Sequence, residues 1–344
     1  MKFKRFGWAG KALGYSLAGA MGVALTAGTA FGDGHLPGEG VTVRPLMSNI
    51  VEELFQAMLV KRGLEELGYD VQPITETQIQ LAHVTVGQGD ADYYTPHWWP
   101  LHKGFWEESG GDDRLQKLEA FVDGPSLQGY LVDKKTADAH GIDNLGQLTD
   151  PEVAKIFDID GDGKADLYGC EPGWGCERVI EHHLTAYGLR DTVTHNQGGY
   201  FAIIPDAIER VRAGNPTLYY TWTPFWVSGI LQPGNNVSWL EVPHTDHPSG
   251  LSEADTTVEG LGNVGFGVNT QHVIASTPFL DANPAAKRWF ELIKMPVSDI
   301  NEQNLKMRDG EKTEADVARH ADEWMAAHKE QWDSWIAQAK EAAK

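Results

Sequence analysis

The sequence is short of cysteine and of basic residues. It has two cysteines in 344 residues, and 28 Lys and Arg residues stand against 49 Asp and Glu residues, which gives a formal net charge of −21. So acidic a chain argues against nucleic acid or an anionic lipid surface as a partner. The hydrophobic content of 41% and the charged content of 22% are those of a soluble globular protein.

The sequence also lacks the local motifs of common hydrolases and nucleotide-binding enzymes. It contains no Gly-x-Ser-x-Gly, no Gly-x-x-x-x-Gly-Lys-Ser/Thr and no His-Glu-x-x-His. The histidines that would have to form a zinc hydrolase site are His182, His183, His244 and His247, and the loop that holds the last two offers no evident third ligand. We therefore expect a protein that is not an enzyme and has no catalytic cofactor.

The N-terminus has the pattern of a secretory signal peptide over residues 1–32. Four basic residues lie between Lys2 and Lys11, an apolar stretch of small residues follows, and Ala30 and Gly32 fit a cleavage site before Asp33. The alternative is a retained membrane anchor, although the stretch is short and rich in Gly and Ser. No cysteine lies near the cleavage site for lipid attachment, so we expect a free periplasmic protein. Cleavage would remove four positive charges and change the net charge from −21 to −25.

The order of predicted elements indicates an α/β fold with two lobes. Strand patterns at 41–43, 69–74 and 91–95 alternate with helical patterns at 49–67 and 76–86, and such alternation is typical of mostly parallel sheets flanked by helices. The pattern restarts at 127–132, and the chain ends in helices at 284–294 and 314–343. A chain of this length exceeds one ordinary core. We expect lobe 1 to comprise 33–125 and 240–344, and lobe 2 to comprise 126–239.

A weak internal repeat marks two strand ends. Gly89-Asp-Ala-Asp-Tyr-Tyr-Thr-Pro-His-Trp-Trp-Pro100 and Gly214-Asn-Pro-Thr-Leu-Tyr-Tyr-Thr-Trp-Thr-Pro-Phe-Trp226 each run from a glycine turn through Tyr-Tyr-Thr into a loop rich in Trp and Pro. Ligands of open α/β sheets bind beyond the carboxyl ends of the strands. The two loops would therefore face each other across a cleft, unless the similarity arose by chance.

Tryptophans in three expected loops suggest a cage for a methylated cation. The residues are Trp98, Trp99, Trp174, Trp222 and Trp226. A trimethylammonium group donates no hydrogen bonds, and its spread positive charge is best held by aromatic faces. Each tryptophan taken singly is more easily explained by packing, so the prediction depends on the set. The tryptophans of the C-terminal helix are expected to be core residues.

The negative end of such a ligand would need hydrogen-bond donors. Gly175 and Cys176 offer backbone N–H groups just before an expected helix, and helix N-termini bind anions. His102 follows Trp98 by four residues and could add a side-chain donor, or it is an ordinary surface or core histidine. Cys170 and Cys176 are close enough in sequence to form a disulfide in an exported protein, the alternative being two buried thiols.

Four motifs carry a resemblance to a known family. They are Trp98-Trp-Pro-Leu-His102, Gly169-Cys-Glu-Pro-Gly-Trp-Gly-Cys-Glu177, Thr194-His-Asn-Gln-Gly198 and Tyr219-Tyr-Thr-Trp-Thr-Pro-Phe-Trp226. Together they resemble the periplasmic glycine betaine/proline betaine-binding proteins of ABC importers, with related members that bind trimethylamine N-oxide. The resemblance runs from about residue 36 to the C-terminus.

The resemblance implies a two-lobe, venus-flytrap fold of type II and a cognate ABC permease in the inner membrane as partner. It implies that Trp98, Trp174 and Trp222 form the cage, and that His102 and the N–H groups of Gly175 and Cys176 hold the carboxylate. It also implies a Cys170–Cys176 disulfide. Ligand binding would close the two lobes, and the closed form would dock on the importer.

One departure from the family pattern bears on the ligand. This chain has His97-Trp98-Trp99-Pro100 where the family has Asn-Trp-Thr-Pro. A second tryptophan beside the cage would shrink the pocket and favour a compact ligand such as trimethylamine N-oxide. Glycine betaine, proline betaine, choline and dimethylsulfoniopropionate remain alternatives.

An acidic loop suggests a second site. Asp158, Asp160, Asp162 and Asp166 surround Gly163 as in the first half of an EF-hand loop, but position twelve is Gly169 rather than Glu. The loop is therefore either a structural Ca²⁺ site or a solvated acidic turn. A secreted calcium-binding envelope protein is the second functional reading of the chain.

Overall fold

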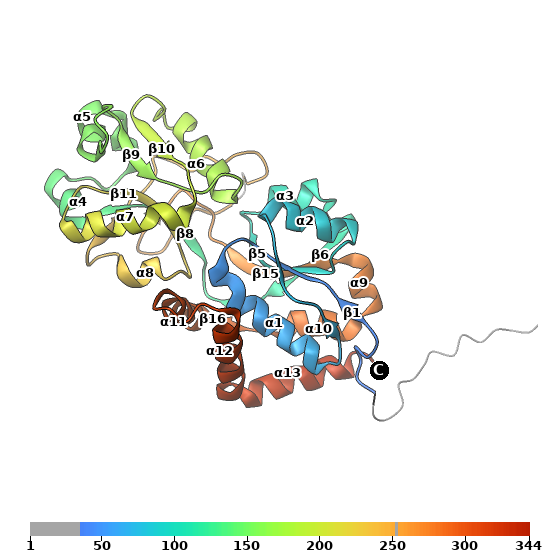
Figure 1. The fold of residues 1–344 in the computed structure, drawn as a ribbon. Helices are drawn as coiled ribbons and strands as arrows, with labels where there is room; N and C mark the ends of the chain where they lie inside the picture. The colour runs from blue at the N-terminus through green and yellow to red at the C-terminus, as the bar shows by residue number, and fades with distance from the viewer. Residues whose placement is uncertain (1–34, 252–253) are drawn as a thin grey trace, which may run out of the picture.

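The computed structural model describes residues 35–251 and 254–344. The proposed signal peptide lies outside these residues. Within them, no helix is both long enough and apolar enough to cross a membrane. The described chain forms two lobes, each built on a five-stranded sheet, which meet along one side (Figure 1).

Lobe 1 is built on a sheet with the strand order β4-β2-β5-β15-β6. Its strands are β2 (Pro45–Met47), β4 (Thr75–Glu76), β5 (Tyr93–Trp99), β6 (Leu115–Ala120) and β15 (Thr270–Ser276). Two small parallel pairs lie beside it: β1 (Thr42–Val43) with β3 (Asp70–Val71), and β7 (Val122–Asp123) with β16 (Met295–Pro296). The strand β15 runs antiparallel to both of its neighbours, whereas β2 is parallel to β4 and β5.

Helices cover both faces of this sheet. The helices of lobe 1 are α1 (Leu54–Glu66), α2 (Ile79–Gln88), α3 (Lys103–Glu108), α9 (Thr277–Ala282), α10 (Pro284–Leu292), α11 (Val297–Arg308), α12 (Glu314–Ala327) and α13 (Lys329–Glu341), with 3₁₀ turns η1 (Val51–Glu53) and η2 (Gly111–Asp113). Consecutive residues of β5 pack into the cores on opposite faces of the sheet. Tyr93 packs with α1, α10 and α13, and Tyr94 packs with α2, as the alternation of side chains along a strand requires.

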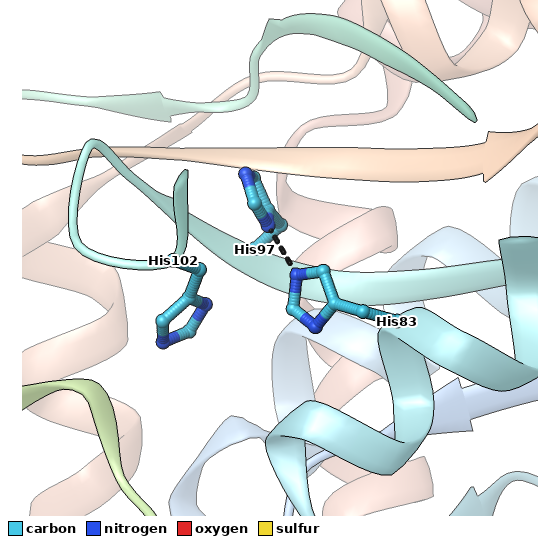
Figure 2. A group of neighbouring side chains, drawn as sticks. All are labelled: His83, His97 and His102. Carbon is cyan, nitrogen blue, oxygen red and sulfur yellow. Dashed lines mark hydrogen bonds between the residues drawn. The ribbon is translucent and has the colours of Figure 1, made fainter. Parts of the chain in front are cut away.

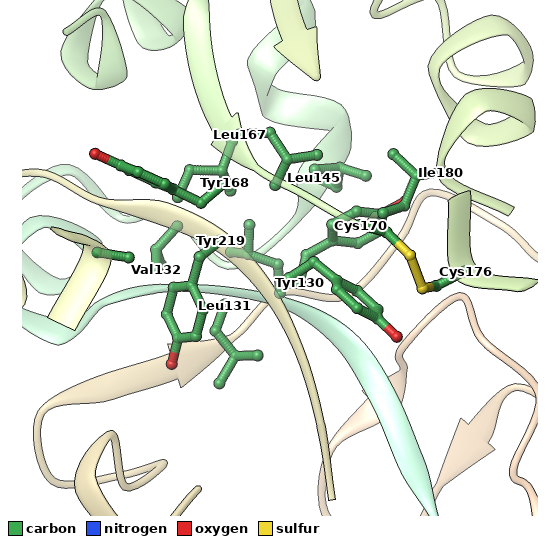
Figure 3. Packing of buried hydrophobic residues seen from close by; sticks show 14 of the residues in the cluster. Tyr130, Leu131, Val132, Leu145, Leu167, Tyr168, Cys170, Cys176, Ile180 and Tyr219 are labelled. Atoms are coloured by element: carbon green, nitrogen blue, oxygen red, sulfur yellow. A yellow bond between two sulfur atoms is a disulfide. The ribbon is translucent and has the colours of Figure 1, made fainter. Parts of the chain in front are cut away.

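Lobe 2 has the strand order β10-β9-β11-β8-β12. Its strands are β8 (Leu127–Asp133), β9 (Ala165–Tyr168), β10 (Val193–Asn196), β11 (Leu218–Thr223) and β12 (Val237–Trp239). Here β8 is the strand antiparallel to both of its neighbours. Its helices are α4 (Lys134–His140), α5 (Pro151–Ala154), α6 (Gly175–Ala186), α7 (Tyr200–Ala213) and α8 (Val227–Ile230), with 3₁₀ turns η3 (Leu145–Thr149) and η4 (Lys155–Phe157). Tyr130, Leu167 and Ile180 belong to its core (Figure 3). The predicted two-lobe α/β fold is confirmed.

The chain crosses between the lobes at two neighbouring points. Ser126 and Asn269 form an isolated antiparallel bridge with N–H···O distances of 2.9 and 3.0 Å. Each crossing leads directly into the antiparallel strand of the next sheet. The segment 240–268, which includes the hairpin β13 (Thr257–Val258) and β14 (Gly262–Asn263), contributes Leu240, Val242 and Phe266 to the core of lobe 2. We therefore propose that lobe 2 extends to about residue 268, beyond the boundary at 239 expected from the sequence.

The expected C-terminal helix is two helices, because the chain turns at His328 between α12 and α13. Trp324, Trp332 and Trp335 are buried against α1 and α10, which confirms their prediction as core residues. The indole of Trp289 in α10 is fully buried beside them and donates its N–H to the Val60 carbonyl at 2.9 Å.

Substitution of Gly63 by Ala should destabilise lobe 1, because a Cβ at this helix position would lie 2.1 Å from the ring of Trp289. Overpacking of a filled core costs about 1–3 kcal/mol. Urea unfolding of G63A should show a loss of this size. The control is G199A, whose Cβ would meet no atom within 4 Å; equal stability of the two variants would contradict the packing described for α1 and α10.

Candidate functional site

A cavity lies where the two lobes meet. The space inside it, its open mouth included, is about 320 Å³. Its walls are Ile50, Ile79, Trp98, Leu101 and His102 from lobe 1, and Gln128, Trp174, Gly175, Cys176, Tyr220 and Trp222 from lobe 2. The predicted residues Trp98, His102, Trp174, Gly175, Cys176 and Trp222 are thus brought together.

The aromatic walls are packed against one another. The rings of Trp174 and Trp222 are nearly perpendicular, with centroids 5.6 Å apart. Trp222 stacks on Phe225 at 4.2 Å and lies 4.7 Å from Tyr200. These contacts hold the rings rigidly, so the cavity presents preformed aromatic surface.

Two cage indoles donate their N–H groups to residues outside the cavity lining. Trp98 donates Nε1–H to Glu53 Oε1 at 2.9 Å, and Trp174 donates Nε1–H to Asn49 Oδ1 at 3.2 Å. A buried indole N–H needs such a partner. With the polar edge bound elsewhere, the cavity is left with almost wholly apolar surface, which suits methyl groups.

Trp99 and Trp226 do not line this cavity. The structure extends β5 through Trp99, where a loop was expected, so Trp98 and Trp99 alternate to opposite faces of the strand. Trp99 lies outside, with Lys117 Nζ 5.0 Å from its ring centroid. Trp226, at the start of α8, is half-buried and donates its N–H to Glu52 Oε1 at 2.9 Å. The expectation that Trp99 shrinks the pocket is therefore wrong, because its ring does not line the cavity.

His102 is oriented to offer a proton to the cavity. Its Nδ1 accepts the backbone N–H of Trp98 at 3.2 Å. Burial first, and then the nearby His83, hold the pKa of His102 well below 6.5, so the ring is neutral. A neutral ring that accepts at Nδ1 carries its proton on Nε2. Among the described residues no partner is found for Nε2, and the ring lines the cavity.

Two further buried histidines pack behind His102 (Figure 2). His83 from α2 and His97 from β5 bond to each other through Nε2 and Nδ1 at 2.8 Å, and His83 Nδ1 bonds to the Ile79 carbonyl at 2.7 Å. Burial lowers the pKa of His83 to about 4 and that of His97 well below 6.5. This cluster could not be predicted from sequence patterns, because its members come from different elements.

The N-terminus of α6 forms the opposite wall. Gly175 and Cys176 are its first two residues, so their N–H groups have no partner within the helix. A side chain at Gly175 would overlap Leu101 of lobe 1, since a Cβ there would lie 2.7 Å from Leu101 Cγ. The Sγ atoms of Cys170 and Cys176 are at bonding distance, with Cα atoms 6.0 Å apart (Figure 3). A disulfide between them would fix the turn that carries Trp174.

Several wall residues were missed from the sequence. Gln128 and Tyr220 lie on the neighbouring strands β8 and β11, and the Tyr220 hydroxyl donates to Gln128 Oε1 at 2.7 Å. Ile50 and Leu101 precede helices of lobe 1, and Ile79 begins α2. For Tyr220 alone a signal existed, because it belongs to the repeated Tyr-Tyr-Thr motif.

Two acidic residues, Glu52 and Glu53, are also buried behind the cavity. Burial is the largest influence on both, and it raises the pKa of Glu52 to about 7 and that of Glu53 to about 8. In the sequence alone they resemble the acidic first turn of the helix expected at 49–67.

The acidic loop lies on the far side of lobe 2 from the cavity. Carboxylate oxygens of Asp158, Asp160 and Asp166 lie within 4.8 Å of one another, whereas Asp162 is not part of this group. Asp158 accepts the N–H groups of Gly161 and Gly163 through its two oxygens. Within the described residues, His182, His183, His244 and His247 form no such group. His182 instead pairs with Asp246 at 2.6 Å.

Comparisons with known proteins show the family of the chain. Residues 41–327 match the family model described as the substrate-binding domain of an ABC-type glycine betaine transport system. The chain is 48% identical over 309 residues to the glycine betaine/proline betaine-binding periplasmic protein of Escherichia coli K12, covering 90% of this chain and 93% of the relative. It is 45% identical to the glycine betaine-binding periplasmic protein OusX of Dickeya dadantii, covering 91% and 94%.

A solved structure shows the same fold at lower identity. Lactococcal OpuAC in its closed-liganded conformation with glycine betaine is similar with a TM-score of 0.63 and 20% sequence identity, over 86% of this chain and 99% of that chain.

The neutral histidines predict a loss of stability in acid. The pKa of His83 is about 4 in the folded protein against an ordinary 6.5. Between these two pH values, His83 is therefore protonated in the unfolded chain but neutral in the folded protein. The contribution of His83 to the free energy of unfolding should fall by up to about 1.4 kcal/mol for each unit by which the pH is lowered in this window. In denaturant unfolding, the stability gap between wild type and H83Q should narrow from pH 7 to pH 4.5. A stability gap that does not change with pH would contradict the neutral buried ring.

Proposed function

This chain belongs to the family of substrate-binding domains of ABC-type glycine betaine transport systems, and from that premise we propose that it binds glycine betaine in the cavity between its lobes. The family is one of binding proteins and not of enzymes. The observation that carries the proposal is the convergence of Trp98, Trp174 and Trp222, from three separate segments, on one small apolar cavity.

The trimethylammonium group would lie among these three rings. Each cation–π contact is worth about 0.5–2 kcal/mol, and a micromolar affinity requires about 8 kcal/mol. Three rings would therefore supply a large part of the binding free energy. The N–H groups of Trp98 and Trp174 are not available to the ligand, since both are bound elsewhere.

The carboxylate would lie at the opposite end, where donors gather. The free N–H groups at the start of α6 and the helix dipole favour an anion. His102 would donate from Nε2, the nitrogen that its bond with Trp98 leaves protonated. The donors of α6 belong to lobe 2 and His102 belongs to lobe 1, so one carboxylate would join the lobes.

Binding would work by closure. Side-chain hydrogen bonds already cross between the lobes, among them those from Trp174 to Asn49, from Asn49 to Glu171, and from Trp226 to Glu52. A ligand that adds contacts to both lobes favours the closed form and shifts the population towards it. We propose that this form is delivered to a cognate ABC permease from the periplasm, where the named relatives function.

Trimethylamine N-oxide is a second candidate ligand, because it presents the same methyl groups to the cage. The argument from Trp99 no longer favours it, since that ring lies outside the cavity. The donors at the start of α6 favour a ligand with a carboxylate. We retain the disulfide Cys170–Cys176 as part of the proposal, since it would fix the turn between the donors and Trp174.

The cage predicts the outcome of two matched tryptophan substitutions. Trp174→Ala removes one wall, so the dissociation constant for glycine betaine in calorimetric titration should rise at least tenfold. Trp99→Ala, only one position from Trp98, should leave it within twofold because its ring faces away. Unchanged affinity in W174A, or equal losses of affinity in both variants, would contradict the proposed tryptophan cage.

Calcium binding by the acidic loop stays a prediction. The convergence of Asp158, Asp160 and Asp166 oxygens supports it. Native mass spectrometry should show a loss equal to one calcium ion on chelation, and D158N should lack that ion from the start. D112N, at an exposed aspartate of another turn, is the control. No change of mass on chelation of the wild type would refute the site.

A further inference from the structure

The buried acidic residues Glu52 and Glu53, here called the carboxylate pair, hold two tryptophans by their N–H groups. They are consecutive residues of the 3₁₀ turn η1. Glu53 Oε1 accepts from Trp98, and Glu52 Oε1 accepts from Trp226. The pair therefore contacts the polar edge of one cage ring and that of its neighbour from lobe 2.

The carboxylate pair has no cationic partner among the described residues, because no ion pair involves either glutamate. Glu53 Oε2 accepts the Ser48 hydroxyl, but Glu52 Oε2 is buried without a hydrogen-bond partner. A buried carboxyl group without a cationic partner favours the protonated, neutral form, and a cation brought beside it favours the ionised form. A pair without a counter-charge, placed beside an aromatic cage, points to a counter-charge supplied from outside.

A second small cavity borders the pair on one side and shares part of its wall with the ligand cavity. It is lined by Glu52, Glu53, Gln56 and Asn304 on one side and shares Ile50, Trp98 and Trp222 with the ligand cavity. Asn304 Oδ1 is a further buried acceptor without a partner. The surroundings of the pair are thus rich in acceptors, and a single layer of rings separates them from the proposed cation site.

We propose that Glu53, with Glu52 beside it, is the counter-charge of the bound cation and favours ligands with a net positive charge. This deepens the proposed function and rests on it. Both carboxylates would act through the ring layer, as positioning and specificity-determining residues. Choline carries one positive charge, whereas glycine betaine carries a carboxylate that the pair repels. Loss of the negative charge should therefore weaken choline binding more than betaine binding.

The pair also links binding to pH. The charged and titratable groups near the pair are Tyr94 of β5 for Glu53, and Tyr200 of α7 and Lys312 before α12 for Glu52. The two glutamates also influence each other. With a pKa of about 8, Glu53 holds a proton in the empty site at neutral pH. A bound cation favours the ionised form, so binding below pH 8 must release a proton. Affinity should therefore rise with pH up to about 8 and level off above it.

The test is calorimetric titration of the whole mature protein with choline and with glycine betaine from pH 6 to pH 9. Neither ligand titrates in this range. Choline affinity of the wild type should rise at least tenfold between pH 6 and pH 8. In E53Q the rise should be lost, and choline affinity at pH 8 should fall about tenfold, with a loss of no more than threefold for glycine betaine.

Glu66 offers a matched control. Its Oε2 also accepts an indole N–H, from Trp332 at 2.7 Å, but Glu66 is exposed at the end of α1 and lines neither cavity. E66Q should keep the wild-type pH profile and the wild-type ratio of the two affinities. If E53Q does not fold, wild-type titrations in buffers of different ionisation enthalpy still decide the matter, because choline binding at pH 7.5 should release protons.

The outcomes separate the two proposals. A flat choline profile, no proton release, or no choline binding together with normal glycine betaine binding would overturn the role of the pair and leave the proposed function intact. A wild type that binds neither glycine betaine nor trimethylamine N-oxide would overturn the proposed function itself.

Discussion

The cavity depends on the need of each buried indole N–H for an acceptor. Trp98 finds it in Glu53 of its own lobe, whereas Trp174 finds it in Asn49 of the opposite lobe. A tryptophan tied by its polar edge can present only carbon surface to a ligand. The same bonds therefore orient the rings and, through Trp174, join the lobes. Site geometry and lobe arrangement follow from one requirement.

The sequence was informative where chemistry is local. The turn Gly173-Trp-Gly-Cys176, the spacing from Trp98 to His102 and the second Tyr-Tyr-Thr repeat lie within short segments, and each contributes residues to the cavity wall. Trp99 was misplaced for a specific reason. The loop expected after Thr95 is a continuing strand, and strand alternation sends adjacent residues to opposite faces. One wrong boundary thus moved a large ring from outside the site to inside it.

Residues that act through distant partners could not be found in this way. Glu52 and Glu53 resemble the acidic first turn of any helix until Trp98 and Trp226 are seen to donate to them. His83 and His97 meet behind His102 only because α2 packs on β5 (Figure 2). The boundary of lobe 2 could not be predicted for the same reason. The segment 240–268 has little regular structure, and only its packing assigns it to a core.

The polar groups of the cavity explain why closure should require a ligand. Bringing the lobes together removes His102 Nε2 and the first N–H groups of α6 from water. A buried donor without an acceptor costs about 1–3 kcal/mol, so closure over an empty site is penalised at each of these groups. The carboxylate of the proposed ligand would accept from both walls and remove the penalty, and its trimethylammonium group would fill the apolar remainder. The differential affinity for the closed form, which alone can shift the population, would thus arise from donors that the protein leaves unpaired.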